Sequence, residues 1–429
     1  MYDSSMNEQD AVFLNDWKWR EILSQATHDE ELRNHLRTQR PVTIYCGFDP
    51  TADSLHIGSL LPLLALRRVQ LAGHRPIVLV GGGTGLIGDP SGKEGERTLN
   101  PAETVSAWTE KLRKQVSRFV DFESGDTSAV VINNYDWLSG LSAIEMLRDY
   151  GKHFSVGAML GKESVRSRLA AGISFTEFSY MILQAYDFLE LRKRLNCTVQ
   201  IGGSDQWGNI TAGMDLIRRA GLDAYGITLP LVTKSDGSKF GKTESGTVWL
   251  DASKTSSYAM YQFWLSTADA DVLRFLKYFT FLQPAEIDAL GKATQEHPEA
   301  REAQRVLARE VTAIVHGRQA VDDAERVTRA FFEEGVATLS GADWNDLAKD
   351  APSTMVRTAE TPLVDSLVGA GLAASKSRAR DLITAGSVSV NDQRVTDPKF
   401  VIQRSGAFQG KYTVIRKGKE RHILVFEGD

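Results

Sequence analysis

Cysteine is scarce in this chain, with only Cys46 and Cys197 among 429 residues. A disulfide framework is therefore excluded, and so few cysteines are typical of a reducing compartment, which predicts a cytoplasmic protein. Histidines and cysteines do not cluster at the spacings of metal sites, so we expect no structural metal. The longest strictly apolar run, Leu60–Leu66, is far shorter than the ~20 residues that cross a bilayer. The N-terminus has neither a basic nor an apolar region, so no secretory signal is expected.

Neither sign of charge dominates, because 50 Lys and Arg stand against 55 Asp and Glu, a net charge of −5. The protein as a whole is therefore not expected to bind nucleic acid. The distribution is uneven, however. Residues 363–429 hold 11 basic against 7 acidic side chains, whereas the preceding residues hold 39 against 48. This asymmetry predicts a nucleic-acid module at the C-terminus, with a chance excess on a solvated face as the alternative.

Short apolar runs alternate with helical patterns in the first half of the chain. Strands are predicted at 42–48, 77–80, 130–132 and 198–201. Continuous apolar strands joined by helices are typical of a mainly parallel sheet that is covered on both faces, an α/β fold. Ligands of such sheets bind at the carboxyl ends of the strands, so a site is expected there. Helices alone are predicted from about 256 to 332.

A glycine-rich loop follows the second predicted strand, and Gly83–Gly88 fits the pattern G-x-G-x-x-G. That pattern alone suggests a dinucleotide-binding enzyme. The next residues, Asp89–Gly92, predict a turn rather than a helix start, and Glu103 lies in a helical pattern instead of at a strand end. A P-loop also fails, because an acidic residue follows Lys93. A tight structural turn would explain the glycines but not the flanking Asp89 and Lys93.

The segment Asp49–Ser59 joins the first predicted strand to a helix. Thr51 and His56 could reach a phosphate at the start of that helix, where free N–H groups and the helix dipole favour anions. Gly58 would let a nucleotide approach the backbone closely. The alternative is an ordinary helix cap at Asp53 or Ser54.

A second loop, 234–243, is rich in Gly and Ser and carries Lys239 and Lys242 three residues apart. Two lysines in such a loop would form a cationic clamp for phosphates. The alternative is the solvated tip of a hairpin.

Together these elements resemble the class I aminoacyl-tRNA synthetases. His56–Ser59 is similar to the HIGH motif of that family, and Lys239–Thr243 is similar to its KMSKS motif. Both depart from the family pattern, since Ser59 replaces the second histidine while Phe240 and Gly241 replace Met and Ser. The resemblance is sharper to the bacterial tyrosyl-tRNA synthetases and runs from about Trp17 to the C-terminus. Four stretches carry it, at 45–58, 85–93, 175–187 and 200–209.

Three polar residues of the third stretch, Tyr180, Gln184 and Asp187, are spaced to share one helix face. Their neighbours are mostly apolar, so an amide and a carboxylate there are costly unless something bonds them. A ligand would satisfy them, and a polar network closed within the protein is the alternative.

The resemblance implies how tyrosine and ATP would be held. Tyr45 and Asp187 would bind the phenolic hydroxyl of L-tyrosine. Its α-ammonium group would be bound by Tyr180, Gln184 and Asp89, and its carboxylate by Gln206. ATP would contact Cys46, Gly47, Asp49, Thr51, His56, Gly58, Gly203, Asp205, Lys239 and Lys242. The catalytic groups at the phosphates would be Thr51, His56, Lys93, Arg97, Lys239, Lys242 and Thr243. Tyrosine would be activated to tyrosyl-adenylate with release of pyrophosphate, and Mg²⁺ would arrive with ATP.

The resemblance also gives the predicted domains their roles. We expect a Rossmann-like parallel-sheet catalytic domain at 1–250, an α-helical domain on the anticodon side of tRNA at 251–350, a linker at 351–362 and a small α+β RNA-binding domain at 363–429. The adenylate would pass tyrosine to the 3′ end of tRNA(Tyr), whose phosphates would contact Lys376, Arg378, Arg380, Arg416, Lys417 and Lys419. The family works as a homodimer, so a homodimer is expected.

Three other functions stay open from the sequence. A tryptophanyl-tRNA synthetase has a similar architecture, but Tyr45 and Asp187 suit a phenol. A small-molecule nucleotidyltransferase with a HIGH-like motif would need neither the lysine pair nor a basic tail. An RNA-binding or splicing factor that had lost catalysis would not need Thr51, His56 and the lysines.

Overall fold

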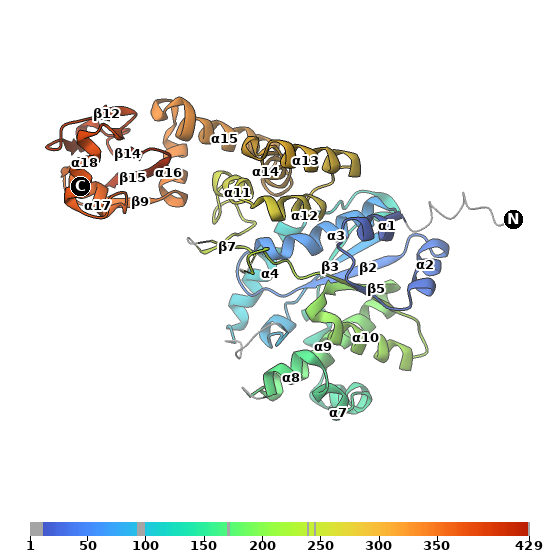
Figure 1. Cartoon of the computed structure of the whole chain (residues 1–429). Helices are drawn as coiled ribbons and strands as arrows, with labels where there is room; N and C mark the ends of the chain where they lie inside the picture. Colours follow the sequence, from blue (N-terminus) through green and yellow to red (C-terminus); the bar gives the residue numbers. More distant parts are fainter. Residues whose placement is uncertain (1–11, 92–98, 170–171, 238–239, 244–245, 428–429) are drawn as a thin grey trace. The chain divides into compact units, whose positions relative to one another are not determined.

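The computed structural model describes residues 12–91, 99–169, 172–237, 240–243 and 246–427 (Figure 1). The chain forms two compact units. The first comprises Met1–Asp251 and Ala268–Ala303, and the second comprises Ala252–Thr267 and Gln304–Asp429. Among the described strands, each unit contains one two-stranded sheet and one larger β-sheet.

The larger sheet of the first unit has the strand order β1-β6-β5-β2-β3-β4. Neighbouring strands are parallel, except that the short β1 runs antiparallel to β6. The strands are β1 (Gln25–Ala26), β2 (Thr43–Phe48), β3 (Arg75–Val80), β4 (Val130–Asn133), β5 (Cys197–Gly203) and β6 (Tyr225–Leu229). The predicted Rossmann-like α/β class is therefore confirmed, and β1 and β6 are strands that the sequence analysis did not foresee.

Helices cover both faces of this sheet, which explains why the residues of its central strands β2, β3 and β5 are mostly buried. In β3 the side chains from Ile77 to Val80 are at most 3% exposed. Figure 1 shows α3 and α12 on one face, and α9 and α10 on the other. The main helices of the unit are α1 (Val12–Trp19), α2 (Asp29–Thr38), α3 (Leu60–Leu71), α4 (Ala102–Val116), α5 (Tyr135–Leu138), α6 (Ala143–Glu145), α7 (Val156–Leu160), α8 (Glu163–Leu169), α9 (Phe175–Leu195), α10 (Trp207–Arg219), α12 (Asp269–Phe279) and α13 (Pro284–Glu296). Across the described ranges, no helix combines the length and apolar character needed to cross a membrane.

Helix α9 carries three of the predicted tyrosine-binding residues. It begins after Ser174, whose side chain accepts a backbone N–H of the first turn, as N-cap residues do. It ends at Asn196, which adopts a left-handed φ of 51°. Tyr180, Gln184 and Asp187 all line one cavity, so they share a helix face as their spacing predicts.

The second unit combines helices with a small mixed sheet. Its described strands form a sheet in the order β12-β11-β14-β15-β9, and β10 pairs with β13. The helices are α11 (Ser257–Leu265), α14 (Glu302–His316), α15 (Arg318–Arg329), α16 (Gly341–Asp350), α17 (Leu363–Gly369) and α18 (Lys376–Thr384). The strands are β9 (Ser353–Val356), β10 (Glu360–Pro362), β11 (Val388–Val390), β12 (Gln393–Val395), β13 (Val401–Gln403), β14 (Tyr412–Lys417) and β15 (Glu420–Phe426).

Trp344 of α16 joins the helices of this unit to its sheet. Its ring stacks on Phe408 and on Tyr412, with centroid distances of 5.2 and 5.4 Å. The Tyr412 hydroxyl donates a hydrogen bond to Asn345 Oδ1 at 2.6 Å. One buried apolar cluster therefore includes α16, the end of α15 and strands β14 and β15.

The structure corrects two predicted boundaries. Residues 351–362, expected to form a linker, contain β9 and β10, which pair with β15 and β13. Strand pairing uses backbone groups, so the Ser, Thr and Pro side chains of an edge strand do not reveal it. Residues 268–303, expected in the helical domain, belong to the first unit, because α12 packs against α3.

Candidate active site

A cavity of 460 Å³ opens where the order of the strands reverses. β3 and β4 lie on one side of β2, while β5 and β6 lie on the other, so the segments after β2 and β5 diverge. Parallel sheets bind their ligands at such a point. The predicted site residues that line the cavity are Tyr45, Cys46, Gly47, Asp49, Thr51, His56, Gly58, Asp89, Tyr180, Gln184, Asp187, Gly203, Asp205 and Gln206.

Tyr45 and Asp187 form a deeply buried part of the lining, each 1% exposed. The Asp187 carboxylate accepts hydrogen bonds from Trp137 Nε1 at 2.7 Å and from Asn134 Nδ2 at 2.9 Å. Burial raises the pKa of Asp187 to about 7, although these two hydrogen bonds act in the opposite direction. Burial, and then the charge of Asp187, hold the pKa of Tyr45 well above its ordinary value, so the phenol keeps its proton.

The Tyr45 hydroxyl has no hydrogen-bond partner among the described residues. Leaving a buried donor without a partner costs about 1–3 kcal/mol. Each oxygen of Asp187 also keeps a lone pair after its one hydrogen bond. A ligand hydroxyl could therefore accept from Tyr45 and donate to Asp187.

Asp49, directly after β2, orders the next part of the cavity. Its two carboxylate oxygens accept hydrogen bonds from Thr84 Oγ1 and from the Tyr180 hydroxyl, both at 2.7 Å. Asn134 Nδ2 in turn donates to Thr84 Oγ1 at 2.9 Å. Because the Tyr180 proton points to Asp49, the Tyr180 oxygen is left to accept a hydrogen bond from a ligand cation.

Asp89, Gln184 and Gln206 form a polar wall. The Asp89 carboxylate accepts Gln206 Nε2 at 2.7 Å and the backbone N–H of Ser91 at 2.9 Å. Gln206 Oε1 accepts Gln184 Nε2 at 3.3 Å. A carboxylate and two amides with fixed directions can bind a group that carries both an ammonium and a carboxylate.

His56 caps the short 3-10 helix Ile57–Ser59 that leads into α3. Its Nδ1 accepts the backbone N–H of Gly58 at 3.0 Å, so the neutral ring carries its proton on Nε2. A Cβ at Gly58 would stand 2.7 Å from His56 Cε1, so only glycine leaves the ring in place. His56 and Thr51 are both exposed on the open side of the cavity.

Cys46 and Asp205 line the cavity at the ends of β2 and β5. Burial raises the pKa of Cys46 to about 12, which excludes a thiolate nucleophile at neutral pH. Burial, and then the charge of Asp89, also raise the pKa of Asp205. A Cβ at Gly203 would stand 2.4 Å from Asp205 Oδ1, so this glycine makes room for the carboxylate.

The two motif loops lie against each other. The backbone N–H of Ile57 donates to Val248 O, and that of Leu250 donates to Leu55 O, both at 2.9 Å. Val248 in turn donates to Gly241 O at 3.0 Å. The described part of the second motif loop therefore lies beside the loop of His56, although the two are separated by almost two hundred residues in the sequence.

Lys242 and Thr243 form β7 (Lys242–Thr243), which pairs with β8 (Gly246–Thr247). Helix α12 supports the same loop, since Asp271 accepts hydrogen bonds from the backbone N–H and the hydroxyl of Ser235, at 3.1 and 3.0 Å. The Phe240 ring stacks on Phe279 at 5.5 Å. The predicted residues Lys93, Arg97 and Lys239 lie outside the described residues.

The predicted tRNA-binding residues lie at the start of α18 and at the tip of the β14–β15 hairpin. Lys417 Nζ donates to Leu372 O in the turn before α18 at 2.9 Å, which brings the two groups together. Lys376 pairs with Asp365 and Lys417 with Glu420, at 2.7 and 2.8 Å. In the described part of this unit, the exposed basic side chains without an ion pair include Arg378, Arg380, Arg416 and Lys419.

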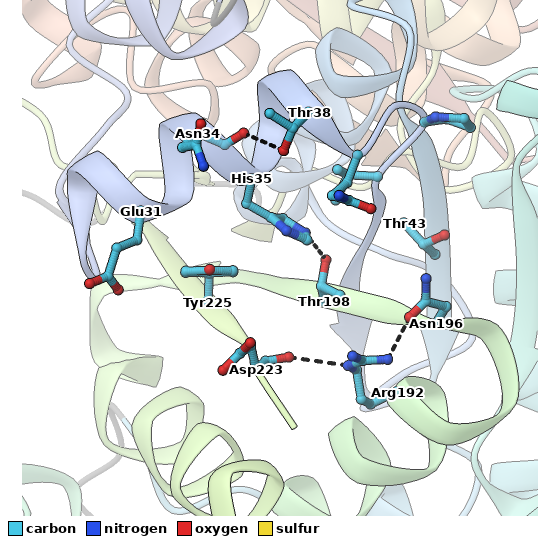
Figure 2. Close-up of a pocket in the computed structure, with 13 residues that line it drawn as sticks. Glu31, Asn34, His35, Thr38, Thr43, Arg192, Asn196, Thr198, Asp223 and Tyr225 are labelled. Carbon is cyan, nitrogen blue, oxygen red and sulfur yellow. Dashed lines mark hydrogen bonds between the residues drawn. The ribbon is translucent and has the colours of Figure 1, made fainter. Parts of the chain in front are cut away.

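A larger cavity of 620 Å³ lies at the opposite, amino-terminal edge of the same sheet (Figure 2). Figure 2 shows His35 directed at Thr198, and the two side chains are 2.7 Å apart. Arg192 bonds the backbone oxygen of Asp223 and the side chain of Asn196. No predicted site residue lines this cavity.

Among the described residues that hydrogen-bond predicted site residues, three that the sequence analysis missed follow strands β3 and β4. Asn134 and Trp137 follow β4 directly and bond Asp187, and Thr84 follows β3 and bonds Asp49. Their place after parallel strands was the available signal, because the carboxyl ends of β3 and β4 lie at the same edge as the cavity.

A parallel sheet whose carboxyl edge joins these two motif loops over a buried polar cavity defines a class I aminoacyl-tRNA synthetase. Residues 37–333 match the family "tRNA synthetases class I (W and Y)", and residues 343–425 match the "Tyrosine--tRNA ligase SYY-like C-terminal domain". The Tyrosine--tRNA ligase of Geobacillus kaustophilus is 54% identical over 414 residues, covering 96% of this chain and 99% of its own. That of Aliivibrio fischeri is 55% identical over 412 residues, covering 95% and 96%. The chain therefore belongs to the tyrosine–tRNA ligase family.

A solved structure agrees with this placement. The C-terminally truncated mitochondrial tyrosyl-tRNA synthetase of Aspergillus nidulans superposes with a TM-score of 0.67 at 31% identity, covering 75% of this chain and 94% of its own. A tryptophanyl-tRNA synthetase from Encephalitozoon cuniculi reaches a TM-score of 0.54 at only 14% identity, covering 76% of this chain and 94% of its own, which shows a shared fold alone.

Proposed function

We propose that this chain is a tyrosine–tRNA ligase, which forms tyrosyl-adenylate from L-tyrosine and ATP and then charges tRNA(Tyr). One observation carries the choice of substrate. The buried Tyr45 hydroxyl lacks a partner in the described structure, and it lines the same cavity as the Asp187 carboxylate. A phenolic hydroxyl satisfies both groups, whereas the side chain of phenylalanine satisfies neither. An indole offers one N–H donor and no acceptor for Tyr45, so a tryptophan substrate is not favoured.

The tyrosine backbone groups bind at the polar wall. The α-ammonium donates to the Tyr180 hydroxyl oxygen, to Gln184 Oε1 and to Asp89. Gln206 orients the carboxylate toward ATP. Tyr180 suits this role because its hydroxyl already donates a hydrogen bond to Asp49 Oδ2 at 2.7 Å, so its oxygen can accept one from the ammonium.

ATP lies across the ends of β2 and β5. Cys46, Gly47, Gly203 and Asp205 contact the adenosine ribose, with Asp49 close by. The tyrosine carboxylate attacks the α-phosphorus in line, and pyrophosphate leaves. A carboxylate is already nucleophilic at neutral pH, so this step needs positioning and charge stabilisation rather than a general base.

The phosphates lie on the open side of the cavity. Thr51 and His56 contact the γ-phosphate region, and Gly58 allows the close approach. The remaining groups stabilise charge on the departing pyrophosphate, and they are Lys93, Arg97, Lys239, Lys242 and Thr243. Mg²⁺ enters with ATP as part of the substrate, since this ion is usually bound through phosphates with few protein ligands. In the described ranges, no group of three or more His, Cys, Asp or Glu is arranged to hold a metal ion.

The second step uses the basic surface of the second unit. Lys376, Arg378, Arg380, Arg416, Lys417 and Lys419 contact tRNA phosphates. The hydrogen bond from Lys417 to Leu372 supports one continuous surface rather than two separate ones. The terminal ribose hydroxyl of tRNA then attacks the adenylate carbonyl, and AMP leaves.

The active form is a homodimer, and an exposed apolar surface supports this. Of the fifteen exposed large hydrophobic side chains in the described residues, seven fall between 135 and 175. Ile144 and Phe175 are 71% and 73% exposed. A monomer rarely exposes so many apolar side chains in one segment, and a second copy of the chain would cover them. Sedimentation should show a dimer that Ile144→Glu dissociates and Leu71→Glu, at a 62% exposed position outside the segment, leaves intact. A monomeric unmodified protein would contradict the dimer.

The site of action is the cytoplasm, which fits two free cysteines. Tyrosine-dependent exchange of pyrophosphate into ATP tests the activity itself. We expect exchange with tyrosine and far less with phenylalanine or tryptophan. Equal exchange with phenylalanine would refute the tyrosine assignment, and no exchange with any amino acid would favour a non-catalytic RNA-binding protein.

A further inference from the structure

Asn209 lies in the first turn of α10 and is 3% exposed. It does not line the cavity. Its Nδ2 stands 3.0 Å from Gln184 Oε1 and 3.1 Å from Gln206 Oε1. One buried amide therefore donates to both glutamines of the polar wall.

These two hydrogen bonds determine which end of each glutamine faces a ligand. With Oε1 of Gln206 held by Asn209 and by Gln184 Nε2, its Nε2 is directed to Asp89 at 2.7 Å. Gln184 Oε1 is held as an acceptor and keeps one lone pair for a further donor. A free glutamine amide can turn over at little cost, because its two ends have nearly the same shape. Asn209 removes that freedom.

We propose that Asn209 is a positioning residue for the amino-acid substrate, which fixes the amides of Gln184 and Gln206 in the orientation that accepts an α-ammonium group. The proposal rests on the proposed role of Gln184 and Gln206 in binding tyrosine. An α-ammonium has only donors, so Gln184 must present its oxygen to it. The same α-ammonium occurs in every amino acid, so Asn209 acts on binding and not on the choice between tyrosine and phenylalanine.

The substitution Asn209→Asp keeps the shape and replaces the donor with an acceptor. The introduced carboxylate would repel both Oε1 atoms, and each glutamine would turn its NH₂ end toward it. Gln206 would then turn its oxygen toward the Asp89 carboxylate, and Gln184 would lose its acceptor for the ammonium. We expect the KM for tyrosine to rise by about tenfold or more, the factor for about 1.4 kcal/mol, while the KM for ATP stays within about twofold.

A pH series separates this role from simple destabilisation. At low pH the introduced carboxyl group is protonated and can again donate one hydrogen bond. The ratio of variant to unmodified tyrosine KM should therefore fall as the pH is lowered from 8 to 6. Gln70→Glu is the matched control, because Gln70 is another buried amide of the same unit, 5% exposed, and donates to Asp121 O and Thr127 O. It should lower stability without changing the tyrosine KM.

Each outcome is decisive when tyrosine KM, ATP KM and the denaturant midpoint are measured for all three proteins. An unchanged tyrosine KM in Asn209→Asp overturns the proposal. An equal rise of the ATP KM in Asn209→Asp also overturns it, as does an equal rise of the tyrosine KM in Gln70→Glu. Either result indicates that a general loss of stability, and not the orientation of the two glutamines, changes binding. If the unmodified protein shows no tyrosine-dependent exchange, the proposed function fails first. Tyrosine binding by equilibrium dialysis would then still measure the effect of Asn209 on the wall.

Discussion

The backbone of Gly241 lies directly against the side chain of Ile57. A Cβ at residue 241 would stand 2.5 Å from Ile57 Cγ2, and the φ of Gly241 is +82°. The family motif that this loop resembles has a serine at this position. The departure has a physical cause here, because only glycine allows the lysine-bearing loop to pack this closely on the loop of His56.

Gly241→Ala should slow adenylate formation and leave tyrosine affinity nearly unchanged. The left-handed φ costs a residue with a Cβ about 1–2 kcal/mol, and the overlap with Ile57 adds about 1–3 kcal/mol. The loop would therefore move away from the phosphate side of the cavity. Single-turnover adenylate formation and tyrosine binding are the measurements.

Gly237→Ala is the matched control for this prediction. Gly237 also has a positive φ, +79°, but nothing lies within 4 Å of its Cβ position. It should show the backbone strain without the overlap, and so a smaller loss of rate. Equal losses in the two variants would show that packing against Ile57 is not the cause.

Tyr45→Phe should reduce the preference for tyrosine over phenylalanine and also stabilise the free protein. The variant loses one hydrogen bond to the substrate hydroxyl, worth about 0.5–1.5 kcal/mol, or up to about tenfold in discrimination. It also removes a buried hydroxyl that has no partner in the described structure, so the unfolding free energy without ligand should rise. Exchange assays with both amino acids and a urea melt test the two effects. An unchanged tyrosine-to-phenylalanine ratio in the folded variant would place Tyr45 outside the substrate pocket.

Discrimination against phenylalanine should depend on pH through Asp187. Its pKa is raised to about 7 by burial, so the group is ionised above pH 7 and protonated below it. A hydrogen bond from a phenol to a carboxylate is stronger than one to a neutral acid. The tyrosine-to-phenylalanine ratio of kcat/KM should therefore fall as the pH drops from 8 to 6. The ratio in Asp187→Asn should be low and independent of pH, and a pH-independent ratio in the unmodified protein would count against Asp187 as the phenol ligand.

The helix face of Tyr180, Gln184 and Asp187 was predictable because helical spacing alone sets which side chains share a face. The use of the strand ends was predictable for the same kind of reason, since parallel strands end at one edge of a sheet. Residue spacing does not predict which polar groups on different helices and strands hydrogen-bond to one another. Asn134 on the β4 side and Thr84 on the β3 side meet only because β3 and β4 are neighbours.

The strands within the predicted linker 351–362 could not be predicted from residue spacing either. β9 lies beside β15 as a parallel edge strand, and its partner lies some seventy residues away in the sequence. Its residues alternate only between exposed and half-buried, so no buried apolar face marks it as a strand. The sequence does not indicate that Trp344 stacks on Tyr412, because an aromatic side chain can pack in any apolar core.

His56→Ala should lower the rate of adenylate formation far more than it weakens tyrosine binding. The ring lies on the open side of the cavity, at the proposed phosphate position, and an interaction made mainly in the transition state lowers kcat and kcat/KM together. Gly58→Ala should reproduce part of this loss, because its Cβ would stand 2.7 Å from His56 Cε1 and would displace the ring. Loss of tyrosine affinity in His56→Ala would contradict the placement of His56 at the phosphates, and full activity of Gly58→Ala would show that the ring is not displaced.

Truncation should separate the two steps of the reaction, provided that the cut removes the whole sheet of the second unit rather than part of it. Removing 363–429 would leave β9 without β15 and would uncover Trp344 and Leu347. Removing 335–429 takes the whole sheet with Trp344 and Leu347 away, and uncovers only the cluster members that remain, such as Val327 and Phe331. We therefore expect the longer deletion to give the more soluble protein, and a C-terminally truncated relative has been solved.

The fragment ending at residue 334 should retain tyrosine-dependent pyrophosphate exchange and lose efficient charging of tRNA. The cavity lies wholly in the first unit, whereas the basic surface around Lys417 and Arg378 is removed. In the full chain, charging should weaken with salt, because each neutralised phosphate releases a counterion. Lys417→Ala and Arg378→Ala should reduce that salt dependence and leave exchange unchanged. Normal charging by the fragment would place the tRNA site elsewhere, and loss of exchange in a folded fragment would mean that the C-terminal part supports the catalytic unit.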